Sequence, residues 1–104
     1  MLKHIVMWKF KEEACEKTKE ENLAIVTEGL LSLLGKVPEL IAIEAGPDVL
    51  KTPASYDMAL ICTFKNKDDM LAYQVNPEHK KVASYISLVS CGRVTADFYT
   101  GEDK

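Results

Sequence analysis

Apolar residues alternate with polar ones in four segments of this chain, and between these segments they recur at helical spacing. The strand patterns fall at residues 3–10, 40–45, 56–65 and 93–99. After the first strand, Thr18 and Glu21 form a capping-box pattern that begins a helix, and Gly35 ends it. The order β-α-β-β-α-β predicts a ferredoxin-like α+β fold with a four-stranded antiparallel sheet, as a single domain over residues 1–104.

The second helix is predicted in two pieces that meet at Asn76 and Pro77. Proline is tolerated at the first position of a helix and disfavours helix in the residue before it, so Asn76 is the expected N-cap. Beyond it, His79 and Ile86 lie seven residues apart on one helix face. Tyr73 ends the first piece, so the break is expected to direct Tyr73 and His79 into one space.

Both alternating sets of residues are largely apolar in the strands at 3–10 and 56–65. The helices of this fold cover one face of the sheet only, and a face open to water would carry polar residues. We therefore expect a second copy of the chain to cover the open face, forming a homodimer with paired sheets. The alternative is a monomer with scattered surface hydrophobic residues.

Composition narrows the possible partners and compartment. The chain is 47% hydrophobic and 28% charged with a net charge of −3, and no basic stripe indicates a nucleic-acid binder. The acidic balance and the lack of a membrane-length apolar run argue against membrane binding. Cys15, Cys62 and Cys91 are odd in number and without CxxC spacing, which favours reduced thiols in a cytoplasmic protein. Cys62 is expected to be inert and Cys91 the more reactive thiol.

Laid out in this way, the chain resembles the stress-responsive dimeric α/β-barrel (Dabb) family over nearly its whole length. The resemblance rests on the segment at 4–11, the Tyr-Asp-apolar-Phe pattern at 56–64, the succession Tyr73, Pro77 and His79, and the segment at 97–99. It implies a dimeric α/β barrel with a pocket in each subunit between helices and sheet.

The resemblance also implies a functional model, the plant polyketide cyclases, which close a linear poly-β-keto compound by aldol condensation without metal or cofactor. A pocket histidine and tyrosine carry that chemistry and match His79 and Tyr73, and a second pocket histidine matches His4. The sequence departs from the cyclases at Asn76, where they have histidine, and in its apolar lining.

The residues themselves allow two interpretations of the pair. Imidazole titrates near neutral pH, so His79 can act as a general base, and Tyr73 can donate a hydrogen bond to an enolate oxygen. The structural alternative is a core histidine bonded to a carbonyl, with Tyr73 as packing. His4 is either a pocket residue or a strand-end histidine near water. The candidate substrate-binding residues are His4, Trp8, Phe64 and Ile86, of which Trp8 and Phe64 suit a core equally well.

No metal or cofactor is predicted, because His4 and His79 have no third ligand at suitable spacing. The leading hypothesis is a cytoplasmic homodimer that binds a small carbonyl-bearing or apolar molecule. If it is an enzyme, it transfers protons without a cofactor, as a cyclase-like or lyase-like catalyst. The alternatives are a non-catalytic stress-response dimer and a haem-type or quinol-type monooxygenase of the same fold.

Overall fold

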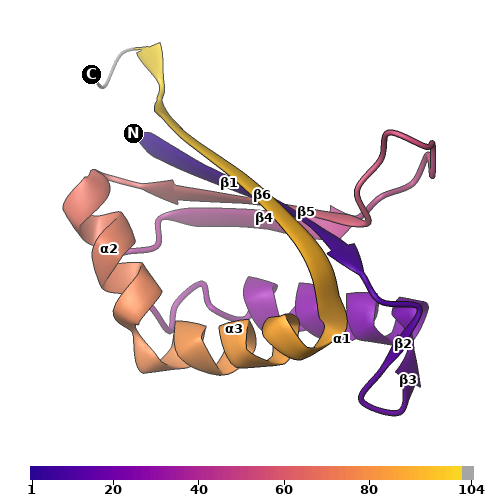
Figure 1. Cartoon of the computed structure of the whole chain (residues 1–104). Helices are drawn as coiled ribbons and strands as arrows, with labels where there is room; N and C mark the ends of the chain where they lie inside the picture. The colour runs from indigo at the N-terminus through magenta and orange to yellow at the C-terminus, as the bar shows by residue number, and fades with distance from the viewer. Residues whose placement is uncertain (102–104) are drawn as a thin grey trace.

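The computed structural model describes residues 1–101 and has the predicted order of elements, with the second helix in two pieces. The elements are β1 (Leu2–Phe10), β2 (Glu13–Ala14), β3 (Lys17–Thr18), α1 (Lys19–Leu31), β4 (Ala42–Pro47), β5 (Met58–Phe64), α2 (Lys67–Val75), α3 (Pro77–Val89) and β6 (Ser90–Tyr99). Strands β4, β5, β1 and β6 form an antiparallel sheet in that order. All three helices lie on one face of it (Figure 1), as a ferredoxin-like α+β fold requires.

Helix α1 begins where the capping box predicts. The Thr18 side chain accepts from the backbone N–H of Glu21, and the Glu21 carboxylate accepts in return from the backbone N–H of Thr18. None of the helices in residues 1–101 is long and apolar enough to cross a membrane.

The charged segment at 11–21 contains a small hairpin before α1. Strands β2 and β3 pair across a turn at Cys15 and Glu16, whose φ angles are 54° and 61°. Positive φ at both central residues is the turn geometry that suits the right-handed twist of paired strands. Neither residue is a glycine, so composition gives no signal for this turn.

The core lies between the sheet and the helices. Alternate residues of the two central strands point into it and are buried, namely Leu2, Val6, Trp8, Phe10, Met58, Leu60, Cys62 and Phe64. His4 belongs to the same alternating set, and only 4% of its surface is exposed. The strand period therefore places a histidine in an otherwise apolar layer.

The opposite face of the sheet is partly apolar. Cross-strand register aligns Met7 with Ala59 on one side and with Val94 on the other, and Lys3 with Phe98. Met7 and Val94 are each 39% exposed, and Phe98 is 49% exposed. Figure 1 shows no helix of the described residues on this face of the sheet.

Asn22 joins the hairpin, α1 and α3. It is fully buried, and its Nδ2 donates to the Ala14 carbonyl at 3.0 Å, while its Oδ1 accepts from the Tyr85 hydroxyl at 2.6 Å. The two bonds fix the helix layer beneath the sheet.

We expect Asn22→Ala to lower the free energy of unfolding by about 1–3 kcal/mol, because it leaves a partly buried carbonyl and a partly buried hydroxyl without their partner. Urea denaturation at a fixed chain concentration measures the change. Ser84→Ala, an exposed substitution on α3, is the control and should change stability by less than about 0.5 kcal/mol. Equal values for the two variants would contradict a structural role for Asn22.

Candidate functional site

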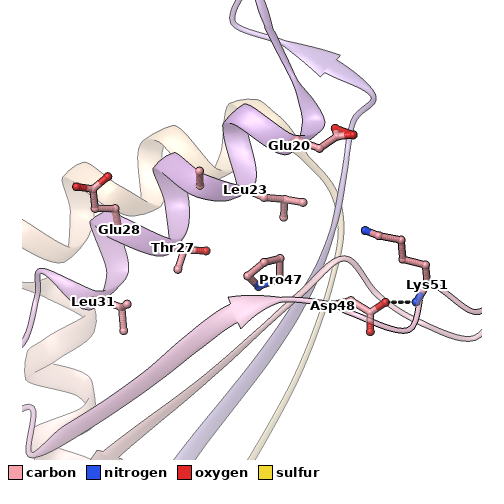
Figure 2. Close-up of a pocket in the computed structure, with 9 residues that line it drawn as sticks. Glu20, Leu23, Thr27, Glu28, Leu31, Pro47, Asp48 and Lys51 are labelled. Atoms are coloured by element: carbon pink, nitrogen blue, oxygen red, sulfur yellow. Dashed lines mark hydrogen bonds between the residues drawn. The ribbon is translucent and has the colours of Figure 1, made fainter.

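Two of the hollows that adjoin α1 differ in the chemistry of their walls. One, of about 510 Å³, lies between α1 and the segment that follows β4 (Figure 2). Its lining is Glu20, Leu23, Ala24, Thr27, Glu28, Leu31, Pro47, Asp48 and Lys51. The Asp48 carboxylate accepts from the Lys51 backbone N–H at 2.6 Å and so shapes the loop. No histidine, cysteine or tyrosine lines this hollow.

The second hollow, of about 350 Å³, lies between the sheet and the helices. Its lining is His4, Val6, Trp8, Leu30, Leu60, Tyr73, His79, Ala83, Ile86, Ser87, Ser90 and Arg93. The structure therefore brings five of the six predicted site residues together around one cavity. This apolar cavity with a few converging polar groups is the candidate site.

Phe64 is the predicted site residue that does not line the cavity. It is fully buried, and its ring packs against Tyr73 with centroids 5.0 Å apart. The phenyl ring lies behind Tyr73 and supports its position.

The helix break positions His79. Asn76 caps α3 by accepting the Glu78 backbone N–H on its Oδ1 at 2.8 Å, so this N–H is not given to the Gln74 carbonyl as in a continuous helix. The Gln74 carbonyl instead accepts from His79 Nδ1 at 3.2 Å. A carbonyl only accepts, so the hydrogen of neutral His79 is on Nδ1 and the lone pair is on Nε2.

Burial keeps His79 neutral. Loss of solvent lowers the pKa of this half-buried imidazole, the bond to the Gln74 carbonyl opposes the shift, and the charges of His4 and Arg93 add to it. The imidazole ring also packs on Tyr73, with centroids 4.4 Å apart. His79 therefore presents an unprotonated nitrogen at neutral pH.

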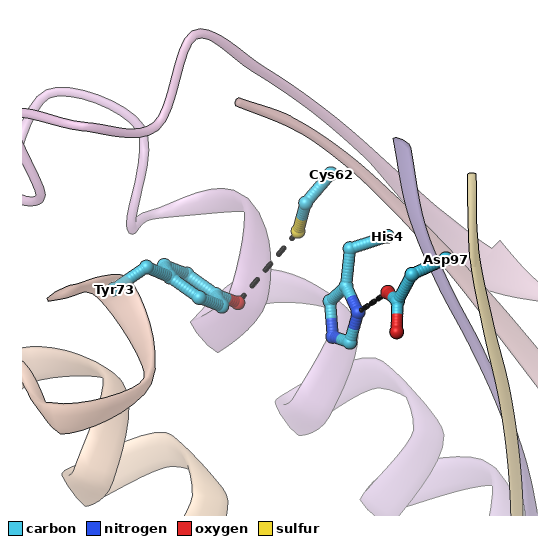
Figure 3. A network of polar contacts seen from close by, with 4 residues as sticks. All are labelled: His4, Cys62, Tyr73 and Asp97. Carbon is cyan, nitrogen blue, oxygen red and sulfur yellow. Dashed lines mark hydrogen bonds and ion pairs between the residues drawn. The ribbon is translucent and has the colours of Figure 1, made fainter. Parts of the chain in front are cut away.

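Tyr73 remains a hydrogen-bond donor. Burial, with smaller effects from Cys62, raises the pKa of Tyr73 far above its usual value, and burial raises the pKa of Cys62 to about 11. The Cys62 thiol donates to the Tyr73 oxygen over 3.7 Å, so the tyrosine hydrogen remains available for a substrate oxygen. Figure 3 shows the Tyr73 ring pointing from α2 toward Cys62 and His4.

His4 has a carboxylate partner that was not predicted from the sequence. Register places Asp97 of β6 directly opposite His4, and its Oδ1 lies 2.5 Å from His4 Nδ1 (Figure 3). The carboxylate orients the ring with Nδ1–H toward β6 and leaves Nε2 as the other nitrogen. His4 is thus a buried pocket residue and not a strand-end histidine near water.

Ser87, Ser90 and Arg93 also line the cavity and were not predicted as site residues. Ser87 and Arg93 are exposed, so the cavity meets solvent between the end of α3 and β6. Among residues 1–101, no group of three or more His, Cys, Asp or Glu side chains is placed to hold a metal ion.

Comparison with known proteins shows the family of this chain. The stress responsive A/B barrel domain, called Dabb, matches residues 2–100. The chain belongs to the Dabb family. No curated protein matches the sequence of this Dabb protein.

Among solved structures, a dimeric ferredoxin-like protein of unknown function from Bacteroides fragilis has 26% identity and a TM-score of 0.78, with 95% of each chain covered. A hydroxynitrile lyase from Passiflora edulis has 18% identity and a TM-score of 0.78 over 97% of this chain and 94% of its own. An antibiotic biosynthesis monooxygenase has 14% identity and a TM-score of 0.69 over 96% of this chain and 98% of its own. The last two likenesses show the shared fold.

We expect His79 to titrate below the usual imidazole pKa of about 6.5, and to carry its neutral-state hydrogen on Nδ1. In acid the unfolded chain then binds a proton that the folded chain does not. The contribution of His79 to stability is therefore complete above about pH 6.5 and is lost as the pH falls through the folded-state pKa. Proton–nitrogen correlation spectra of the histidine rings, recorded from about pH 4 to about pH 8 where imidazoles titrate, measure both the pKa and the position of the hydrogen. A pKa at or above the usual value, or hydrogen on Nε2, would contradict the assigned bond.

Proposed function

We propose that this Dabb protein binds a small carbonyl compound in the cavity and transfers a proton without a cofactor. His79 is the base, and Tyr73 donates a hydrogen bond to the oxygen on which charge develops. The observation that carries the proposal is the convergence of the two side chains on one cavity, with His79 Nδ1 bonded to the Gln74 carbonyl.

The protonation states suit these roles. A base must be unprotonated at the working pH, and burial gives His79 that state. An oxyanion donor must keep its hydrogen, and the raised pKa of Tyr73 ensures that it does. The mostly apolar walls strengthen both interactions, because hydrogen bonds and charges act more strongly where water is excluded.

His4 supplies a second site of proton transfer in the same cavity. Its bond to Asp97 holds one ring nitrogen, as a carboxylate holds the histidine of a catalytic triad, and leaves the other for substrate. A histidine that removes a hydrogen from carbon carries that proton on Nε2 and can return it to the oxygen of the product. Aldol-type ring closure, as in a polyketide cyclase, needs such a removal and return of protons.

The likeness to a hydroxynitrile lyase supports acid–base lyase chemistry on this fold. The likeness to a monooxygenase has the lower identity, and no arrangement of side chains in the cavity favours that reaction. A non-catalytic stress-response dimer is the remaining alternative, and it predicts binding without turnover.

We expect this protein to accelerate exchange of the α-hydrogens of phenylacetone in D₂O, followed by proton NMR. His79→Gln should slow the exchange by about 10²- to 10⁴-fold, because the base is lost. Tyr73→Phe should slow it by about 10²- to 10³-fold, because one donor to the enolate oxygen is lost.

Lys80→Gln is the matched control, since Lys80 is exposed beside His79 and does not line the cavity. Its exchange rate should equal that of the unmodified protein. Thermal melting of each variant separates loss of chemistry from loss of fold. Exchange at the rate of buffer alone, with phenylacetone bound, would favour the non-catalytic dimer.

We also propose that the chain forms a cytoplasmic homodimer through the open face of the sheet. The apolar side chains on that face support the dimer, as does the dimeric state of the Bacteroides fragilis protein. The three free thiols Cys15, Cys62 and Cys91 suit a reducing compartment.

Light scattering at micromolar concentration should give twice the chain mass of 11.6 kDa. We expect Val94→Lys to shift the mass toward one chain, because it places a charge on the apolar face. Val49→Lys is the control, since Val49 is 84% exposed in the loop after β4. A single-chain mass for the unmodified protein would refute the dimer.

A further inference from the structure

Arg93 is the only arginine in this sequence, and the other twelve of its thirteen Lys and Arg residues are lysines. It stands four residues after Val89, the last residue of α3, and lies directly opposite Trp8 of β1. From this position its side chain lines the mouth of the candidate site.

The guanidinium carries the one permanent charge of the cavity wall. The other polar lining residues in the described chain are two histidines, a tyrosine and two serines, and Asp97 lies behind His4 and outside the lining. No carboxylate within residues 1–101 forms an ion pair with Arg93. A neutral ligand would leave the positive charge of Arg93 without a negatively charged partner in the cavity.

We propose that the ligand of this site is a keto acid, whose carboxylate is bound by Arg93 and whose carbonyl lies at Tyr73 and His79. The inference rests on the proposed function and names its substrate class. A guanidinium matches a carboxylate with two parallel hydrogen bonds, which an ammonium group does not reproduce.

The register also sets the spacing of the two ends of the ligand. Arg93 faces Trp8, whereas Asp97 and its partner His4 lie four residues along the same two strands, which is about 13 Å of strand. On α3, His79 precedes Ser90 by eleven residues, which is about 16 Å of helix. The backbone of Arg93 is thus well separated from the backbone of the two histidines, although the Arg93 charge still acts on His79.

The walls between the two ends are apolar. Val6, Trp8, Leu30, Leu60 and Ile86 supply them. A ligand that fits carries its carbonyl and its carboxylate several carbons apart, on a flexible or aromatic chain.

The test compares 7-oxooctanoate with its neutral amide, 7-oxooctanamide, by NMR titration of the His79 ring signals. We expect the acid to bind the unmodified protein at least tenfold more tightly than the amide. In Arg93→Gln the acid should lose this advantage, while the affinity for the amide is unchanged. Arg93→Lys should keep only part of the preference for the acid, because an ammonium group lacks the two parallel N–H donors of a guanidinium.

Lys80→Gln removes the same charge from an exposed position outside the cavity lining and should keep the full preference for the acid. Melting curves confirm that the Arg93 variants are folded. Equal affinity for acid and amide, or a preference that survives Arg93→Gln, overturns the carboxylate assignment.

Failure of this assignment is distinguishable from failure of the proposed function. If the acid does not bind but phenylacetone exchange is accelerated, the keto-acid inference is wrong and proton transfer stands. If neither compound shifts the His79 signals and phenylacetone exchange is also absent, both are wrong.

Discussion

The geometry of the candidate site depends on one backbone constraint, the break between α2 and α3. In a continuous helix the Gln74 carbonyl would accept a hydrogen bond from the backbone N–H of Glu78. Here the side chain of Asn76 accepts that N–H instead. The carbonyl left over is the group that orients His79. The same change of direction sets the His79 ring against Tyr73. A cap therefore fixes both the position of the proposed base and the nitrogen on which its hydrogen lies.

The two histidines of the cavity are held by opposite means. A neutral carbonyl and burial hold His79, and the result is a lowered pKa. A carboxylate of a neighbouring strand holds His4 through the corresponding nitrogen. Each ring is thus fixed at Nδ1, and each leaves Nε2 for chemistry. The cavity therefore holds two imidazole rings, each of which can remove a proton and return it.

Local pattern was sufficient for those parts of the structure that depend on neighbours in sequence. Strand alternation, the Thr18 capping box and the Pro77 break set the order of elements and placed Tyr73 with His79. The missed features depend on pairing between distant strands. Asp97 meets His4 across 93 residues because β6 pairs with β1 in one register, and sequence spacing alone does not specify that register. Arg93 reaches the cavity for the same reason.

The period of a strand also couples the site to the proposed dimer. In β1, His4 and Trp8 face the cavity, while Ile5 and Met7 between them face the open side of the sheet. A shift of one residue in the pairing of β1 with β6 would exchange the two sets and separate His4 from Asp97. Apolar residues on both faces penalise that shift less than a polar face would, so burial alone specifies the register weakly. The partly buried bond between His4 and Asp97 forms in only one register, and it therefore supplies specificity that the apolar residues lack.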